Sequence, residues 1–109
     1  MKNWKSALKN GLAIGLLAAS SSGWGQSMSF GDSDCGQWVA NPEGRKSWLM
    51  GYLSGMNSAT ADPTKNIDHL KKLKSAQQAY LWVDKYCREN PLKNVSDGGI
   101  ALFIELIKK

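Results

Sequence analysis

The chain has 109 residues, which limits it to one compact domain, because single domains commonly contain about 100–150 residues. It carries 14 basic and nine acidic side chains, for a formal net charge of +5, but only one histidine and two cysteines. A zinc site needs three or four clustered ligands, which so few histidines and cysteines cannot supply. We therefore expect no metal and no cofactor.

The first 25 residues have the pattern of an export signal. Three lysines precede an apolar run over residues 11–19, and small residues follow up to Gly25. This run is much shorter than the roughly 20 apolar residues that a membrane-spanning helix needs. We expect cleavage after Gly25, with cleavage after Ala19 as the alternative, and export to the periplasm without a membrane span.

Removal of residues 1–25 changes the charge of the chain. They hold three of the 14 basic side chains and none of the nine acidic ones, so residues 26–109 have a net charge of only +2. A nucleic-acid-binding protein needs a concentrated cationic face on the folded domain. The remaining basic run, Lys71 to Lys74 with Lys65 before it, is more typical of a solvated linker. We expect one domain over residues 26–109 and no nucleic-acid partner.

Enzyme motifs do not occur in this sequence. It contains no HExxH, GxSxG, GxxxxGK or CxxC pattern. The single histidine, His69, lies in a polar, lysine-rich stretch without a nucleophile turn, so a surface position is its simplest interpretation. Nine scattered acidic residues place some pair of carboxylates together by chance. These observations argue against catalysis, and we predict no catalytic residue.

The two cysteines, Cys35 and Cys87, are expected to form a structural disulfide. Their number is even, and an exported chain meets an oxidising compartment. Closing a loop of roughly 50 residues stabilises a fold by about 4 kcal/mol in the chain-entropy model. That is a large share of the roughly 5–10 kcal/mol that holds a small domain together. Redox-active cysteine pairs are closely spaced, unlike these two.

Hydrophobic periodicity predicts helices, because no apolar-polar alternation persists between turn residues as it does in a strand. A short first helix is expected over residues 34–40, capped by Asp32 or Ser33. The segment from Asn41 to Gly44 then breaks it.

A second helix is expected over about residues 45–59. Its apolar side chains form one broad stripe: Trp48, Leu49, Tyr52, Leu53 and Met56. Gly51 and Gly55 lie beside the stripe, and each costs a helix about 1 kcal/mol relative to alanine. A close approach by another helix or an aromatic ring would compensate for this cost, and the seam of a homodimer is the alternative.

Residues 60–74 form the longest polar stretch, with room for one helical turn around residues 67–73. A third helix is expected to begin with a capping box at Ser75 to Gln78 and to stop before Pro91. One face of it carries Tyr80, Val83 and Cys87, with Trp82 and Tyr86 beside them.

The last helix is expected to start at Ser96, whose hydroxyl suits an N-cap. Its apolar residues are spaced i, i+3, i+4, i+7: Ile100, Phe103, Ile104 and Ile107. The fold predicted is all-α, a small four-helix bundle with one long-range disulfide, in which packing alone holds the last helix.

The tryptophans of the helical stripes, Trp38, Trp48 and Trp82, are expected to pack in the core. One exposed beside Tyr52 or Tyr86 would instead mark a partner site.

Three segments of the chain resemble known families. Cys35-Gly-Gln-Trp38, the segment from Trp48 to Gly55 and the segment from Trp82 to Pro91 resemble the Rap1a/Tai immunity proteins. They are also similar to the HdeA/HdeB acid-stress chaperones. The resemblance covers roughly residues 35–106, mostly at packing positions, so it concerns the fold more than the activity. It implies an exported all-α domain with a long-range disulfide.

Resemblance to the immunity proteins implies a dimeric periplasmic protein that plugs the active-site cleft of a secreted cell-wall-degrading effector enzyme. The polar loop is then the natural plug. We predict that its partner-binding residues are Asp62, Lys65, His69, Lys71 and Lys72.

Resemblance to the chaperones implies a protein that is folded near neutral pH and opens in acid to bind unfolded client proteins. A third hypothesis is an accessory envelope protein of a secretion or conjugation system. We favour the immunity-type inhibitor over both. In all three cases the partner is another protein.

Overall fold

The computed structural model describes residues 28–109, so the expected export signal and its cleavage site lie outside the described residues. Four α-helices follow one another: α2 (Cys35–Ala40), α3 (Arg45–Thr60), α4 (Ala76–Glu89) and α5 (Val95–Lys108). Two short 3-10 helices, η2 (Pro63–Lys65) and η3 (His69–Lys72), lie between α3 and α4. No strand occurs within residues 28–109, only two isolated bridges. The predicted all-α, four-helix fold is confirmed.

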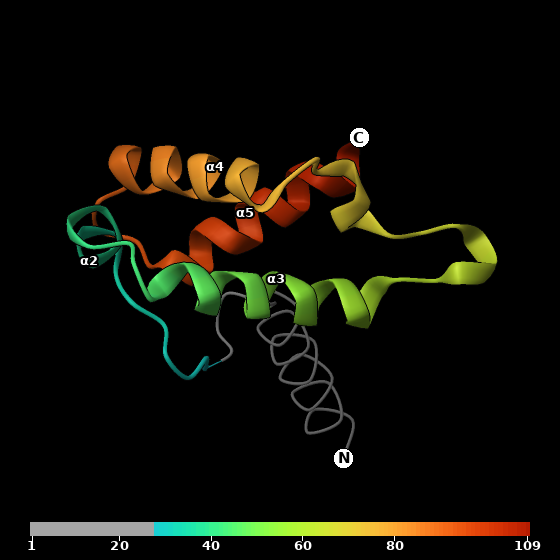
Figure 1. Cartoon of the computed structure of the whole chain (residues 1–109), viewed down its shortest axis with the longest axis horizontal. Helices are drawn as coiled ribbons and strands as arrows, with labels where there is room; N and C mark the ends of the chain where they lie inside the picture. The colour runs from blue at the N-terminus through green and yellow to red at the C-terminus, as the bar shows by residue number, and fades with distance from the viewer. Residues whose placement is uncertain (1–27) are drawn as a thin grey trace, which may run out of the picture.

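Helix α5 organises the bundle. It packs against both α3 and α4, which lie on either side of it, while α2 packs against α4 (Figure 1). Between these helices lies a single apolar core, to which every α-helix contributes. Its largest fully buried side chains are Trp38, Phe103, Leu49, Leu53 and Leu102.

The predicted disulfide joins Cys35, the first residue of α2, to Cys87 near the end of α4. The two Cα atoms are 4.7 Å apart, and both side chains are buried. A helix of six residues is too short to be stable by itself. The covalent bond and the burial of Trp38 therefore hold α2 on the bundle.

The helix caps differ from those predicted. Helix α2 is capped by Asp34, whose carboxylate accepts a hydrogen bond from Gln37 N at 2.8 Å. Ser75 caps α4 without a side-chain hydrogen bond, so the predicted reciprocal box does not form. The Gln78 amide instead accepts a hydrogen bond from Lys74 N at 2.7 Å. Lys74, the residue before Ser75, therefore donates the hydrogen bond that the predicted box assigned to Ser75 N.

Helix α5 begins at Val95, not at Ser96, and its capping box is formed by Asn94 and Asp97. The prediction that packing alone holds α5 was wrong. Val95 N donates to Ser33 O at 2.8 Å, and Cys35 N donates to Lys93 O at 2.9 Å. These bonds join the segment before α2 to the start of α5.

Close helix packing occurs at a different glycine pair from the one predicted. Gly51 and Gly55 are exposed, and a Cβ atom at either would meet nothing within 4 Å, so no close approach compensates for them. The close approaches are on α5. A Cβ atom at Gly98 would lie 3.0 Å from the Tyr86 ring, and one at Gly99 would lie 3.1 Å from the Tyr52 ring.

Because of this packing, α5 buries a different face from the apolar stripe that the sequence predicts. Gly98 and Gly99 face α4 and α3, and the buried side chains in register with them are Leu102, Phe103 and Leu106. Of the predicted stripe only Phe103 is buried, whereas Ile104 and Ile107 are exposed. The sequence stripe was wrong because it ignored glycine as a contact residue.

Candidate functional site

The segment between α3 and α4 is a structured loop whose outer part projects away from the helices (Figure 1). Two backbone hydrogen bonds between Asp62 and Ile67, both 2.9 Å long, close residues 62–67 into a small loop, here called the tip loop. The side chains from Pro63 to Asn66 are all exposed. The most protruding part of the segment is thus also closed by hydrogen bonds.

Side chains within the tip loop fix its shape. The Asp62 carboxylate accepts hydrogen bonds from Thr64 N at 3.0 Å and from Thr64 Oγ1 at 2.6 Å. The ring of Pro63 fixes the φ angle of residue 63 itself. Asn66 adopts a left-handed conformation with φ 56°, which asparagine tolerates better than most residues. The tip loop is therefore ordered by its own residues.

The base of the loop is bonded to α3. The Asn57 amide donates to Asp68 Oδ1 at 2.9 Å and accepts from Leu70 N at 3.2 Å. One side chain of α3 thereby fixes both the start and the middle of η3. The tip loop is thus attached to a segment that hydrogen bonds fix to α3; this segment, η3 with Asp68, is called the base.

His69 and Lys72 belong to this base. The His69 ring packs edge-on against Phe103, with 5.5 Å between centroids, and is half-buried. His69 is thus at the surface but not fully solvated, because η3 turns its ring toward Phe103. Lys72 Nζ donates to the Leu106 carbonyl near the end of α5 and lies 3.3 Å from His69 Nδ1.

The five residues predicted to bind a partner thus occupy three kinds of place. Asp62 holds the tip loop together from inside, and His69 and Lys72 lie side by side in the base. Lys65 in the tip loop and Lys71 in η3 are exposed, and so is Lys72.

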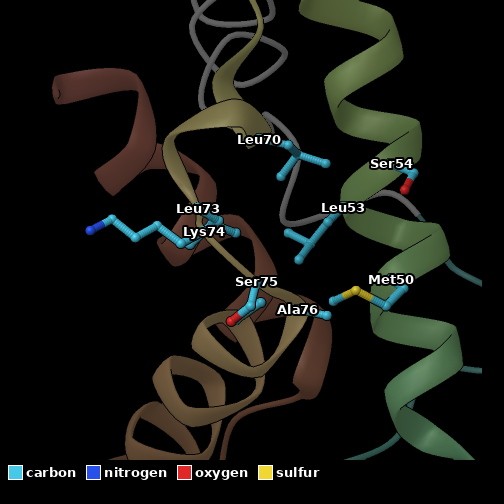
Figure 2. Close-up of a pocket in the computed structure, with 9 residues that line it drawn as sticks. Met50, Leu53, Ser54, Leu70, Leu73, Lys74, Ser75 and Ala76 are labelled. Atoms are coloured by element: carbon cyan, nitrogen blue, oxygen red, sulfur yellow. The ribbon is translucent and has the colours of Figure 1, made fainter.

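An apolar depression lies beside the base, between α3 and the segment from η3 to the start of α4. Its volume is about 240 Å³, below the roughly 300–1,000 Å³ of clefts that hold drug-sized ligands. Met50 and Leu53 extend into it from α3, with Leu70 on the other side, while the Lys74 side chain extends away (Figure 2). It suits an apolar side chain better than a cofactor. No sequence pattern predicts this depression, because its walls come from separate elements.

Two stacked aromatic pairs lie on the outer parts of the helices. The ring centroids of Trp48 and Tyr52 are 4.8 Å apart, and those of Trp82 and Tyr86 are 6.0 Å apart. All four side chains are half-buried, so of the three tryptophans expected in the core only Trp38 is fully enclosed.

Both tyrosines of these pairs resist ionisation. Burial raises the pKa of Tyr52 and of Tyr86, and the Asp97 carboxylate raises both further. For Tyr52, the Asp32 carboxylate acts in the same direction, while a hydrogen bond with Ser29 opposes the shift of the pKa.

Within residues 28–109, no three side chains of the His, Cys, Asp or Glu type gather in a way that could hold a metal ion. The helices of this described part are also too short or too polar to cross a membrane. Comparison with models of known families, with curated proteins and with solved structures found no match to this chain.

Proposed function

We propose that the chain is an exported periplasmic protein that binds and inhibits a secreted cell-wall-degrading enzyme with its tip loop. The observation that carries this proposal is the closed and exposed tip loop, standing on a base that is bonded to α3. The disulfide supports export, because such bonds persist in oxidising compartments. The export-signal pattern of residues 1–25 supports it independently.

A closed loop is suited to entering a cleft. Binding costs about 0.5–1.5 kcal/mol for each flexible side chain that becomes fixed, and ordering a mobile backbone adds to this. In the tip loop, the bonds between Asp62 and Thr64 and between Asp62 and Ile67 have already fixed the backbone. A partner would therefore bind a rigid projection. Protease inhibitors likewise change little in backbone conformation when they bind their enzymes.

The exposed cation of the tip loop suits the cleft of a cell-wall hydrolase. Glycoside hydrolases carry a pair of catalytic carboxyl groups in their clefts. The tip loop carries one acidic and one basic side chain, of which Lys65 is exposed, whereas Asp62 is half-buried and its carboxylate is bonded to Thr64. The tip loop thus offers a cation to a carboxylate-lined cleft.

The proposal is tested by capture from envelope extract with the oxidised protein, produced from the full chain and purified after export. We expect the wild type to enrich a cell-wall hydrolase and Lys65→Glu to lose it. Lys93→Glu makes the same charge change at an exposed lysine outside the loop and serves as the matched control. Equal enrichment by all three proteins, or enrichment of no hydrolase, would contradict the proposal.

An acid-activated chaperone is the second candidate, favoured by one observation. Two carboxylates hold the start of α5: Asp32, in the segment before α2, accepts from Ser96, and Asp97 accepts from Asn94 N within the cap of α5. In acid the nine acidic side chains of the chain lose their charge, and the net positive charge that results favours expansion. If this function is right, the protein suppresses aggregation of an unfolding client at low pH. Acid-induced exposure of apolar surface without that suppression would exclude it.

A further inference from the structure

A second candidate interaction surface lies between α4 and α5. One face each of α4 and α5 lines a groove of about 610 Å³ there, here called the α4–α5 groove. Each helix contributes residues at the spacing i, i+3, i+4, i+7, which places them on one helical face. They are Gln78, Leu81, Trp82 and Lys85 on α4, and Leu102, Glu105, Leu106 and Lys109 on and just after α5.

The middle of this groove is apolar and partly open to solvent. Leu102 and Leu106 form a buried floor, and Trp82 is half-buried beside them. Leu81 is 71% exposed and lies next to Trp82 in the lining of the groove, so the two side chains form one apolar patch. The stacked pair Trp82 and Tyr86 extends the apolar surface toward the end of α4.

The rim of the groove is cationic. It carries four lysines and a single glutamate: Lys72, Lys74, Lys85, Lys109 and Glu105. The contact between Lys85 and Glu89, at 3.9 Å between exposed groups, is too weak to remove Lys85 from this rim. The protein has a net charge of only +2 over residues 26–109, so this concentration of lysines is local.

The spread of the lysines indicates what fits. Lys74 lies before α4, whereas Lys85 lies roughly nine residues into the helix, which is about 14 Å along its axis. A fatty acid or a single headgroup has its charge at one point and cannot meet both. A bilayer surface is flat, while the Leu102 and Leu106 floor is recessed. A protein segment carries several carboxylates and apolar side chains over this length.

We propose that the α4–α5 groove binds an acidic segment of a partner protein, whose apolar side chains pack on Leu81 and Trp82 while its carboxylates meet the lysine rim. The recognition is of the helix-in-groove type, in which an amphipathic segment lays its apolar face into a groove. This surface uses none of the tip-loop residues, so it is independent of the inhibitory function proposed above.

The test uses the oxidised protein produced from the full chain and a fluorescein-labelled peptide of about 14 residues, which as a helix spans about 20 Å. Its leucines are spaced i, i+3, i+4, i+7 and most other positions are glutamate. A peptide of the same composition with the leucines scattered is the control. Vesicles of phosphatidylglycerol and phosphatidylethanolamine form the second arm.

Two groove variants and two control variants locate the binding site. We expect the double variant Lys74→Glu and Lys85→Glu to weaken peptide binding by about tenfold or more, with a loss of the salt dependence seen for the wild type. Leu81→Ser, at an exposed position where folding is not at risk, should weaken it by about fivefold. Lys93→Glu and Lys65→Glu should stay within about twofold of the wild type.

The proposal is overturned by any of three results. They are equal affinity for the two peptides, equal affinity of the groove variants and the controls, and binding to anionic vesicles but to neither peptide up to about 1 mM. Retained peptide binding by Lys65→Glu, together with loss of hydrolase capture, separates this surface from the tip loop.

Discussion

Asp32 accepts hydrogen bonds from both the backbone nitrogen and the hydroxyl of Ser96, which lies 64 residues later in the chain. The bonds are part-buried and link the segment before α2 to the first turn of α5. A carboxylate at this position also matches the partial positive charge of a helix N-terminus. The pair therefore helps to order the segment before α2, together with the backbone hydrogen bond from Val95 N to Ser33 O.

Replacing Asp32 is predicted to destabilise the protein. Asp32→Ala removes a charged acceptor and leaves the Ser96 hydroxyl without its partner, so we expect a loss of about 1–2 kcal/mol in the free energy of unfolding. Urea denaturation followed by tryptophan fluorescence measures it. Ser58→Ala, an exposed change on α3, should stay within about 0.5 kcal/mol. Equal denaturation midpoints for both variants would disprove the role of the pair.

Loss of the disulfide is predicted to be costlier. Removal of a native disulfide from a small exported domain usually costs about 2–5 kcal/mol, and here α2 depends on the bond. The double variant Cys35→Ala and Cys87→Ala should unfold at a much lower urea concentration than the oxidised wild type. Reduced wild type should behave like the variant, and an unchanged midpoint in both would contradict the prediction.

Substitution by alanine is predicted to lower stability at the closely packed Gly99 and to raise it at the exposed Gly51. Gly99→Ala places a methyl group 3.1 Å from the Tyr52 ring, which is itself stacked on Trp48 and has little room to move. We expect a net loss of about 1 kcal/mol. Gly51→Ala meets nothing within 4 Å and should gain about 0.5–1 kcal/mol from helix propensity.

Thermal unfolding of the two alanine variants measures both signs in one experiment. If Gly99→Ala were as stable as Gly51→Ala, the close approach of α5 to α3 would be wrong.

Alkaline stability is predicted from the two tyrosines. Because the pKa of Tyr52 and of Tyr86 is raised in the folded state, the folded protein retains protons that the unfolded chain releases above about pH 10. Their contribution to stability is therefore fully present below pH 10 and is lost as the pH rises through the folded pKa values.

Urea denaturation at a series of pH values from about 9 to 12 measures this dependence. The double variant Tyr52→Phe and Tyr86→Phe should show a smaller loss of stability over this range than the wild type. An identical slope in the two proteins would contradict the assignment.

Much of the fold was predictable because its signals are local or obligatory. The helix over Arg45–Thr60 follows from an apolar stripe, and two cysteines allow only one pairing within the chain. What failed depends on contacts between distant residues. The buried face of α5 follows from Gly98 and Gly99 receiving the rings of Tyr86 and Tyr52, and no periodicity within α5 records that.

The candidate sites show the same division. The exposure of Lys65 follows from its polar surroundings, and the sequence pointed to this loop by its length and charge. The inward turn of His69 onto Phe103 and the closure of the tip loop at Ile67 depend on tertiary contacts. The lysine rim of the α4–α5 groove was also missed, because its members are scattered from Lys72 to Lys109 along the chain.

The most direct test of the proposed function is the turnover of peptidoglycan by purified cell-wall hydrolases while the oxidised protein is titrated in. We predict that one hydrolase loses its activity at a near-stoichiometric amount of wild type and of Lys93→Glu, and retains it with Lys65→Glu. Unchanged turnover across a panel of glycosidases, amidases and endopeptidases, or equal inhibition by Lys65→Glu, would contradict inhibition by the tip loop.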